Sequence, residues 1–254
     1  MFIHLILLIV AFAANFLAAL SGGGAGFIQF PILIFLGLPF ALALGTHKVA
    51  VVFLGLGTIF KKRHDLNKFD WRMSMLMIFI GCPAVILGTV SIIEVNDSIA
   101  KVVLGLLTIG IGIYNIFKKD FGLIETSQPS APVQWLVSCT ALFSIGFFSG
   151  SFSSGAGLFA TVCLIKFFGF NIRTAIEQSL IWVGGLWNFV GALTMGTFGQ
   201  INWSWEPALI TGAFLGGYIG TYYGNKMKLK WIKLLFIAVS ILSGFMLLIS
   251  AYNP

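Results

Sequence analysis

Apolar runs of membrane-spanning length alternate with short polar segments along almost the whole chain. Because the hydrocarbon core of a bilayer takes about 20 residues of α-helix, each long run predicts a transmembrane helix. The longest polar segment covers only residues 117–132, which leaves no room for a separate globular domain. The pattern predicts an all-α polytopic membrane protein whose function lies inside the bilayer.

The predicted helices form two similar sets. Each set begins with an apolar helix, continues through a break rich in glycine or serine into a short helix, and ends with three longer spans. The short helices are expected at residues 27–36 and 156–168. The longer helices are expected at residues 2–19, 39–60, 71–93, 98–117, 133–148, 171–195, 205–223 and 231–250.

The two breaks lie at corresponding places and share a sequence pattern. The first runs from Ser21 to Gly26 and the second from Ser149 to Gly157, so that Gly24-Ala25-Gly26 is answered by Gly155-Ala156-Gly157. A spacing of 132 residues then pairs Ala43 with Ala175, Trp71 with Trp203, Gly88-Thr89 with Gly220-Thr221, and Lys101 with Lys233. This internal duplication predicts two repeats, at residues 1–117 and 133–254, within one membrane domain.

Charge predicts how the repeats are oriented. The loop at residues 61–72 is rich in Lys and Arg, whereas its counterpart at residues 196–203 has no charged residue. Since cytoplasmic loops collect Lys and Arg, these equivalent loops are expected on opposite sides of the membrane. The second repeat would then be inverted, each repeat being a broken or re-entrant helical hairpin plus three transmembrane helices. The linker at residues 118–132 is expected in the cytoplasm.

The composition agrees with this class and excludes others. Hydrophobic residues make up 58% of the chain and charged residues 9%, and the mean hydropathy is +1.00. The net charge of +7 is explained by the basic loops, so no nucleic-acid partner is expected. The three cysteines lie in apolar runs and the three histidines are scattered, so we expect no metal site, cofactor or catalytic set, and no enzyme.

The breaks predict a polar cavity in the middle of the membrane. Backbone that leaves a helix inside a bilayer is tolerated only against protein or a wet cavity. Each short helix after a break presents free N–H groups and the positive end of its dipole, which favours anions. Inverted repeats with broken helices are typical of secondary transporters, whose substrate lies near the bilayer midplane.

Candidate substrate-binding residues come from the breaks and from the spans that follow them. The alternative is that glycine and serine in each break only permit close helix packing, which is our interpretation of the glycines at every fourth position of residues 212–224. The candidates are Ser21, Gly22, Gly23, Gly24, Gln29, Thr46, His47, Lys48, Ser151, Ser153, Ser154, Gly155, Gln178, Ser179 and Asn188.

Three ionisable residues are singled out. Lys48 lies about 13 Å along its predicted span, so it is expected to be the main counter-charge of an anionic substrate. The alternative is that it reaches towards the interface or neutralises backbone carbonyls. His47 and Glu177 are candidates for proton coupling, although Glu177 could instead form an ion pair with Arg173, four residues earlier on the same helix.

Several short motifs, in this order, resemble the TauE/SafE (sulfite exporter) family of membrane permeases. They are the first break up to Pro31, Ala43-Leu44-Gly45-Thr46, the second break, and Gly199-Gln200-Ile201-Asn202-Trp203. The resemblance covers nearly the whole chain. It implies transport of sulfur-containing anions such as sulfonates, sulfoacetate or sulfite across the bacterial cytoplasmic (inner) membrane. The small polar triplets of the family are replaced here by Gly45-Thr46-His47 and Glu177-Gln178-Ser179, which predicts an asymmetric site.

The sequence thus predicts a secondary transporter that works by alternating access, with the substrate between the two breaks. The alternative is an anion channel, or a membrane sensor that binds an anion without moving it. The expected partners are a small anionic substrate and the lipid bilayer, and a homodimer is left open.

Overall fold

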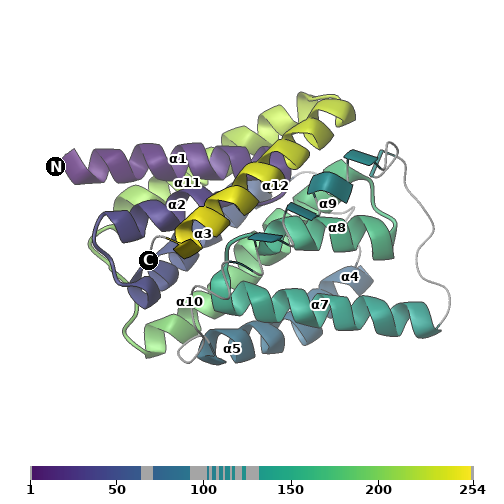
Figure 1. Cartoon of the computed structure of the whole chain (residues 1–254), viewed down its shortest axis with the longest axis horizontal. Coiled ribbons are helices and arrows are strands. Elements are labelled where there is room, and N and C mark those ends of the chain that lie inside the picture. The colour runs from purple at the N-terminus through teal and green to yellow at the C-terminus, as the bar shows by residue number, and fades with distance from the viewer. Residues whose placement is uncertain are drawn as a thin grey trace.

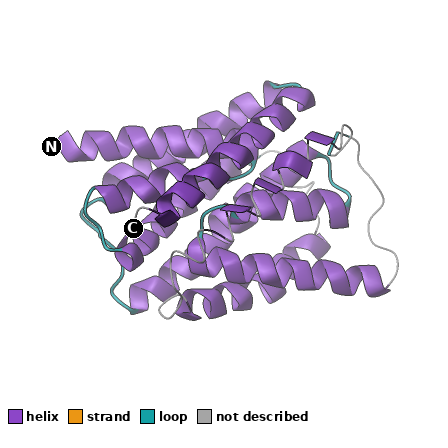
Figure 2. Ribbon diagram, in the orientation of Figure 1, coloured by secondary structure: helices purple, strands orange, loops and turns teal. Residues whose placement is uncertain are grey.

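The computed structural model describes residues 2–63, 71–91, 102, 105–106, 109–110, 112–114, 116–117, 122–123 and 132–252. Within these residues all regular structure is helical (Figure 2), which confirms the predicted all-α fold. The first half contains α1 (Phe2–Ser21), α2 (Ala25–Phe35), α3 (Phe40–Lys62), α4 (Trp71–Leu76), η2 (Met77–Gly81) and α5 (Cys82–Ser91). The second half contains α7 (Pro132–Phe152), α8 (Ala156–Phe168), α9 (Ile172–Ser179), η4 (Leu180–Trp187), α10 (Asn188–Thr197), α11 (Glu206–Lys226) and α12 (Leu229–Tyr252).

Six helices of the described chain are long and apolar enough to cross a membrane, so the protein is a multi-pass membrane protein. Two of them are composite, since α4, η2 and α5 run on as one helix and α9, η4 and α10 as another. The six are Phe2–Ser21, Phe40–Lys62, Arg72–Ser91, Pro132–Phe152, Ile172–Thr197 and Leu229–Met246. The predicted span at residues 98–117 and the linker after it lie largely outside the described residues.

The helices pack in pairs that correspond under the predicted repeat. Helix α1 packs along α11, and α7, its counterpart in the second half, packs along α5. In Figure 1, α1, α11 and α12 lie along one side of the molecule and α5 and α7 along the other. Helix α3 packs against η4 between these two sides. The inverted orientation of the repeats stays a prediction.

Glycines on α11 allow α1 to approach closely. A Cβ added at Gly212 would lie 2.5 Å from the Leu8 carbonyl oxygen, and one at Gly216 would lie 2.7 Å from that of Phe12. Such distances leave no room for a larger side chain. The glycine pattern of this span therefore serves helix packing, as its period suggested.

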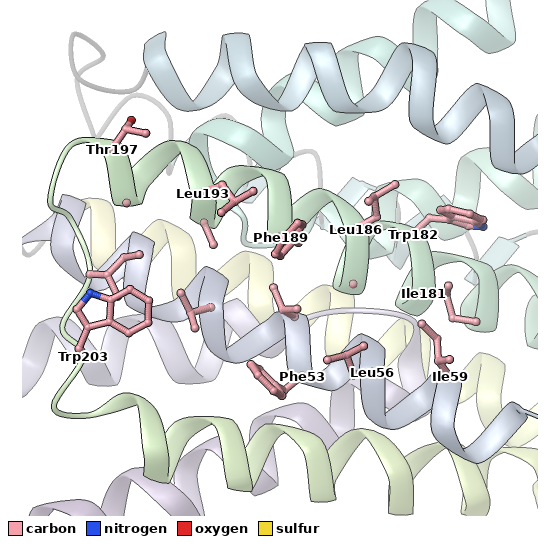
Figure 3. Close-up of a pocket in the computed structure, with 16 residues that line it drawn as sticks. Phe53, Leu56, Ile59, Ile181, Trp182, Leu186, Phe189, Leu193, Thr197 and Trp203 are labelled. Atoms are coloured by element: carbon pink, nitrogen blue, oxygen red, sulfur yellow. The ribbon is translucent and has the colours of Figure 1, made fainter.

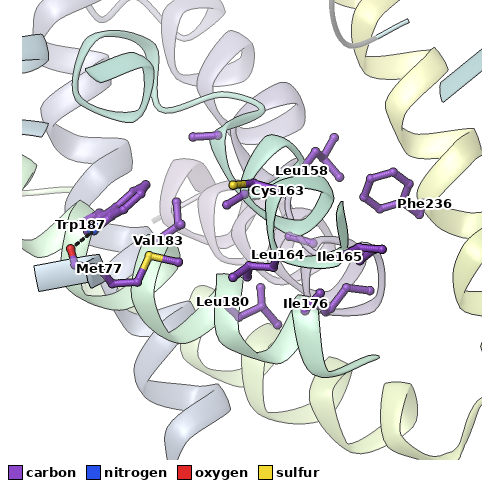
Figure 4. Close-up of a cluster of buried hydrophobic side chains, with 14 of the residues drawn as sticks. Met77, Leu158, Cys163, Leu164, Ile165, Ile176, Leu180, Val183, Trp187 and Phe236 are labelled. Atoms are coloured by element: carbon purple, nitrogen blue, oxygen red, sulfur yellow. Dashed lines mark hydrogen bonds between the residues drawn. The ribbon is translucent and has the colours of Figure 1, made fainter. Parts of the chain in front are cut away.

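Two π-helical segments, η2 and η4, were not predicted. A π-helix leaves carbonyls that need partners outside the regular ladder, and here side chains supply them. The Trp187 indole donates to the Met77 carbonyl at 2.9 Å, and the Asn188 amide donates to the Val183 carbonyl at 2.7 Å. The first of these bonds ties η4 to η2 at one edge of the buried apolar cluster (Figure 4).

The second break is shorter than the sequence suggested. Helix α7 continues to Phe152, so Ser149, Gly150 and Ser151 are helical and only residues 153–155 interrupt the chain. Nothing in those three residue types forbids a helix. The chain leaves the helix where φ becomes positive, at Ser153 (56°).

Candidate functional site

The two short helices begin in the same way. Gly24 precedes α2 with φ of 99°, and Gly155 precedes α8 with φ of 81°, both in the left-handed region that favours glycine. No side chain of the described residues caps either helix. The first backbone N–H groups of both helices therefore have no side-chain acceptor and can donate hydrogen bonds to a ligand or to water.

The breaks face each other through equivalent contacts. A Cβ added at Gly26 would lie 2.6 Å from Ser154 Oγ, and one at Gly157 would lie 3.0 Å from the Gly23 Cα. When the breaks are aligned, Gly26 corresponds to Gly157 and Gly23 to Ser154. The two contacts thus correspond, which relates the breaks by a local two-fold pseudosymmetry.

A small cavity of about 30 Å³ lies between the breaks. Val51, at the midpoint of α3, and Gly184, beside the midpoint of the continuous helix over residues 172–197, both line it, so it lies at mid-span. It has room for about two water molecules. Polar side chains, glycines and apolar side chains such as Leu54 and Val183 all line it. The polar side chains are His47, Ser153, Ser179 and Asn188, and the glycines include Gly22, Gly23, Gly24, Gly26 and Gly157.

Two side-chain hydroxyl groups donate hydrogen bonds to the Gly157 carbonyl, in the first turn of α8. Ser179 Oγ donates to the Gly157 carbonyl at 2.9 Å, and Thr161 Oγ1 donates to the same carbonyl at 2.8 Å. Thr161 also lies 3.2 Å from the Gly22 carbonyl oxygen. The Gly157 carbonyl is thereby engaged, and the uncapped first residues of the two short helices, Ala25 and Gly26 of α2 and Gly157 of α8, line the cavity. The sequence interpretation missed Thr161, whose signal was its place one turn after the glycine that it contacts.

His47 and Ser179 occupy equivalent positions in the two repeats, and both line the cavity. His47 Nε2 lies against Gly26, while its Nδ1 has no hydrogen-bond partner among the described residues. The ring is almost completely buried. An unpartnered imidazole nitrogen in the wall of a polar cavity is a candidate ligand or proton carrier.

Ser153 and Asn188 form another part of the wall. Ser153 Oγ donates to Asn188 Oδ1 at 2.9 Å, and the Asn188 amide reaches back to the Val183 carbonyl. The bond links the second break to the point where η4 becomes α10. The π-helical segment therefore shapes the cavity directly.

Lys48 is buried but is not among the described residues that line the cavity. Its ammonium donates to the Ser149 carbonyl at 2.6 Å, and its stem packs on Gly191. Ser149 precedes Ser153 by four residues and Gly191 follows Asn188 by three, so the ammonium lies about one helical turn from the cavity wall. The charge can act on the cavity through its field.

Ser21 and Gln29 make their contacts within the first hairpin. Ser21 Oγ donates to the Leu17 and Gly23 carbonyls, which stabilises the end of α1. The Gln29 side chain accepts from Asn15 of α1 at 2.9 Å, and both side chains are completely buried. Asn15 was not singled out from the sequence, because a polar residue in an apolar run shows its partner only in the fold.

Thr46 lies at the end of α3 away from the basic loop and binds another part of the chain. Its hydroxyl oxygen accepts from the Asn202 N–H at 2.9 Å, and the neighbouring Gly45 lies against the Gln200 carbonyl. The motif at residues 43–46 and the motif at residues 199–203 thus form one contact.

Two further candidates also bind outside the cavity lining. Ser151 Oγ donates to the Gly88 carbonyl of α5 at 2.9 Å, and Gln178 Oε1 accepts from the Trp182 indole at 2.9 Å. The first bond joins α7 to α5, and the second lies within the continuous helix formed by α9 and η4. A direct role of either residue in binding stays a prediction.

Glu177 forms an ion pair with Lys62 of α3, with 2.7 Å between the charged atoms. Arg173, the partner considered from the sequence, donates to the Met227 carbonyl instead. Within the described residues, no three His, Cys, Asp or Glu side chains gather where they could hold a metal ion.

A second, larger space is apolar. A groove of about 840 Å³ runs between α3 and the helix formed by η4 and α10 (Figure 3). None of the 16 described residues that line it is charged, and Phe53, Leu56, Phe189 and Leu193 are among them. An anion would lose its hydration there without gaining partners, so the small polar cavity is the candidate site.

A multi-pass helical protein with a small cavity at mid-span, between two helix breaks, has the architecture of a membrane permease. The chain belongs to the sulfite exporter TauE/SafE family, whose profile matches residues 7–247. The resemblance seen in the short motifs is thereby confirmed.

Relatives from several bacteria support the same class. The chain is 28% identical over 248 residues to a probable membrane transporter protein of Haemophilus influenzae, covering 95% of this chain and 91% of the relative. It is 28% identical to the probable membrane transporter protein ORF9 of a Sinorhizobium species, covering 98% and 93%. It is 27% identical to the probable membrane transporter protein YunE of Bacillus subtilis, covering 96% of each chain. No solved structure matches the chain.

Proposed function

We propose that the protein is a secondary transporter of small sulfur-containing anions that works by alternating access. The observation that carries the proposal is the pair of uncapped helix N-termini, after Gly24 and Gly155, beside one small cavity at mid-span. Helix N-termini offer N–H donors and a positive dipole end, and two of them act together here.

The chemistry of the wall matches an oxyanion. The oxygens of sulfite or of a sulfonate group accept hydrogen bonds. The first residues of α2 and α8, which no side chain caps, line the cavity, while Thr161 and Ser179 engage the Gly157 carbonyl. Lys48 supplies a positive charge about one turn away. We assign it the role of counter-charge through its field.

The substrate class is extended to this chain from the name of its family, which is sulfite exporter. The cavity of about 30 Å³ suits the head of such an anion, since it holds about two water molecules. The organic part of a larger sulfonate would need space that opens when the breaks move apart. Sulfite and the smallest sulfonates are therefore the best candidates.

Of the two predicted proton carriers, His47 lines the cavity, whereas Glu177 forms an ion pair with Lys62. We therefore assign proton coupling to His47. A bacterial cytoplasmic membrane location is proposed from the bacterial relatives and from the basic loops.

Counterflow in proteoliposomes tests this function. Vesicles loaded with unlabelled sulfite should take up external radiolabelled sulfite faster than empty vesicles. The reason is that internal sulfite binds to an alternating-access carrier and speeds the return of its binding site to the outside. A channel would give uptake without this acceleration, and a sensor would give binding without uptake. Either of those outcomes, with the protein correctly inserted, would contradict the proposal.

A further inference from the structure

The basic side chains gather at one end of the helix bundle. Lys62 at the end of α3 pairs with Glu177 of α9, and Arg173 of α9 donates to the Met227 carbonyl after α11. Lys61 lies over the ring of Tyr222 on α11. This end, called the basic end below, is the one expected to face the cytoplasm.

A second, smaller cavity lies between the central cavity and the basic end. Its volume is about 10 Å³, close to the space that one water molecule needs. The polar or charged side chains in its lining are Arg173, Glu177, Thr221 and Asn225. Leu180 lines both this cavity and the central one.

Two apolar side chains of the described residues, Leu180 and Ile176, lie between the two cavities and are called the partition below. Leu180 borders both spaces. Ile176 lies one turn earlier and packs on the first break, where a Cβ added at Gly22 would come within 2.7 Å of Ile176 Cγ1. Side chains of this kind can change rotamer without moving the backbone.

The opposite end is closed by backbone. The loop at residues 199–203 lies on α3, with the Gln200 carbonyl against Gly45 and the Asn202 N–H bonded to Thr46 Oγ1. Aromatic packing lies near it, with the rings of Phe30 and Phe40 edge to face at 5.1 Å. Opening this end requires a loop and a packed cluster to move together.

We propose that the anion enters and leaves the central cavity at the basic end, past Leu180 and Ile176, and that the Lys62–Glu177 ion pair is the latch of this passage. The proposal rests on the proposed transport function and adds its route. Glu177 lies three residues before Leu180, so the pair holds the same stretch of helix that carries the partition.

An anionic substrate can weaken the Lys62–Glu177 ion pair. An anion that approaches the basic end competes with the Glu177 carboxylate for Lys62, and Arg173 beside it attracts the same charge. When Glu177 loses its partner, α9 is no longer tied to the end of α3. Arrival of substrate therefore favours opening.

Thiol labelling of the full-length protein tests the route without any transport assay. Ser179→Cys places a thiol in the central cavity, in a background where Cys82, Cys139 and Cys163 are replaced by alanine. The probe is sulfonatoethyl methanethiosulfonate, a membrane-impermeant anion. Asn225→Cys places a thiol at the basic end, and its labelling measures the fraction of protein whose basic end faces the probe.

The expected result is that Ser179→Cys reacts faster from the basic end than from the opposite end. Glu177→Gln and Lys62→Met should each raise that labelling rate several-fold. The double variant should raise it no further, because either substitution alone already breaks the same ion pair. Lys61→Met is the matched control and should leave the rate unchanged. If one latch variant fails to fold, the other carries the test.

Faster labelling from the opposite end would overturn the route, and an unchanged rate in a folded Glu177→Gln or Lys62→Met variant would overturn the latch. Neither result depends on which anion is carried. A protein that shows the expected labelling but transports no sulfur anion would contradict the proposed function and leave the passage standing.

Discussion

At the scale of single residues, the two-fold relation of the breaks does not extend to charge. His47 in the first repeat is answered by Ser179 in the second, and Lys48 is answered by Leu180. The backbone therefore offers two similar helix ends, whereas the Lys48 ammonium beside the cavity comes from the first half. We expect the anion to lie off the pseudosymmetry axis, towards the Lys48 ammonium, which lies against Ser149 and Gly191 of the second half.

Lys48→Met tests the ammonium. The variant keeps an unbranched side chain but loses the charge and the bond to the Ser149 carbonyl, and hydrogen bonds to charged groups are worth about 1.5–3 kcal/mol. We predict that initial sulfite uptake falls about tenfold or more, while Lys48→Arg keeps part of it. Uptake within about twofold of the unmodified protein, in a monodisperse variant, would remove Lys48 from the mechanism.

Gly23→Ala tests the contact between the breaks. Gly23 has φ of 150°, and an added Cβ would lie 2.7 Å from the Leu158 nitrogen. Gly37 has φ of 100° but nothing within 4 Å of an added Cβ, so it shares the backbone cost and lacks the overlap. We predict that thermal stability in detergent falls clearly more for Gly23→Ala than for Gly37→Ala, by about 1–3 kcal/mol of extra destabilisation. Equal losses of thermal stability in the two variants would mean that the two breaks are not in close contact at Gly23.

At the scale of elements, the sequence was sufficient for most helices because apolar length is a local signal. Helix α8 was predicted at residues 156–168, where it lies. The π-helical segments were not predicted, because their carbonyls are satisfied by partners such as Trp187, which bonds Met77, 110 residues away in the chain. The Ser149 carbonyl that binds Lys48 could not be predicted for the same reason, because it lies 101 residues away in the chain.

Asn188→Leu tests the role of η4. The substitution leaves the Val183 carbonyl and the Ser153 hydroxyl without their bonds, and an unsatisfied buried group costs about 1–3 kcal/mol. We predict lower thermal stability and a loss of sulfite uptake that exceeds the loss of folded protein. Thr194→Val, on the same helix, removes only a local bond to the Val190 carbonyl and should transport normally. Similar uptake in both variants would count against a functional π-helix.

At the scale of the whole molecule, the family could be predicted from the order of short motifs, and the repeat stays a prediction. The spatial meaning of the motifs could not be predicted, since the contact of Thr46 with Asn202 joins segments 156 residues apart. The fold closes the two ends of the central cavity differently, with a loop at one end and with side chains and an ion pair at the other. Alternating access would require both closures to open in turn.

Charge movement on a solid-supported membrane, with the purified protein in liposomes, tests the central claim most directly. The panel is sulfite, a small aliphatic sulfonate, an aromatic sulfonate, a carboxylate matched to the aliphatic sulfonate, and chloride. The account predicts a saturable displacement for sulfite and the small sulfonate, a weaker one for the carboxylate, and its loss in Lys48→Met. A response that does not saturate, or that treats the sulfonate, the carboxylate and chloride alike, would contradict a sulfur-anion carrier.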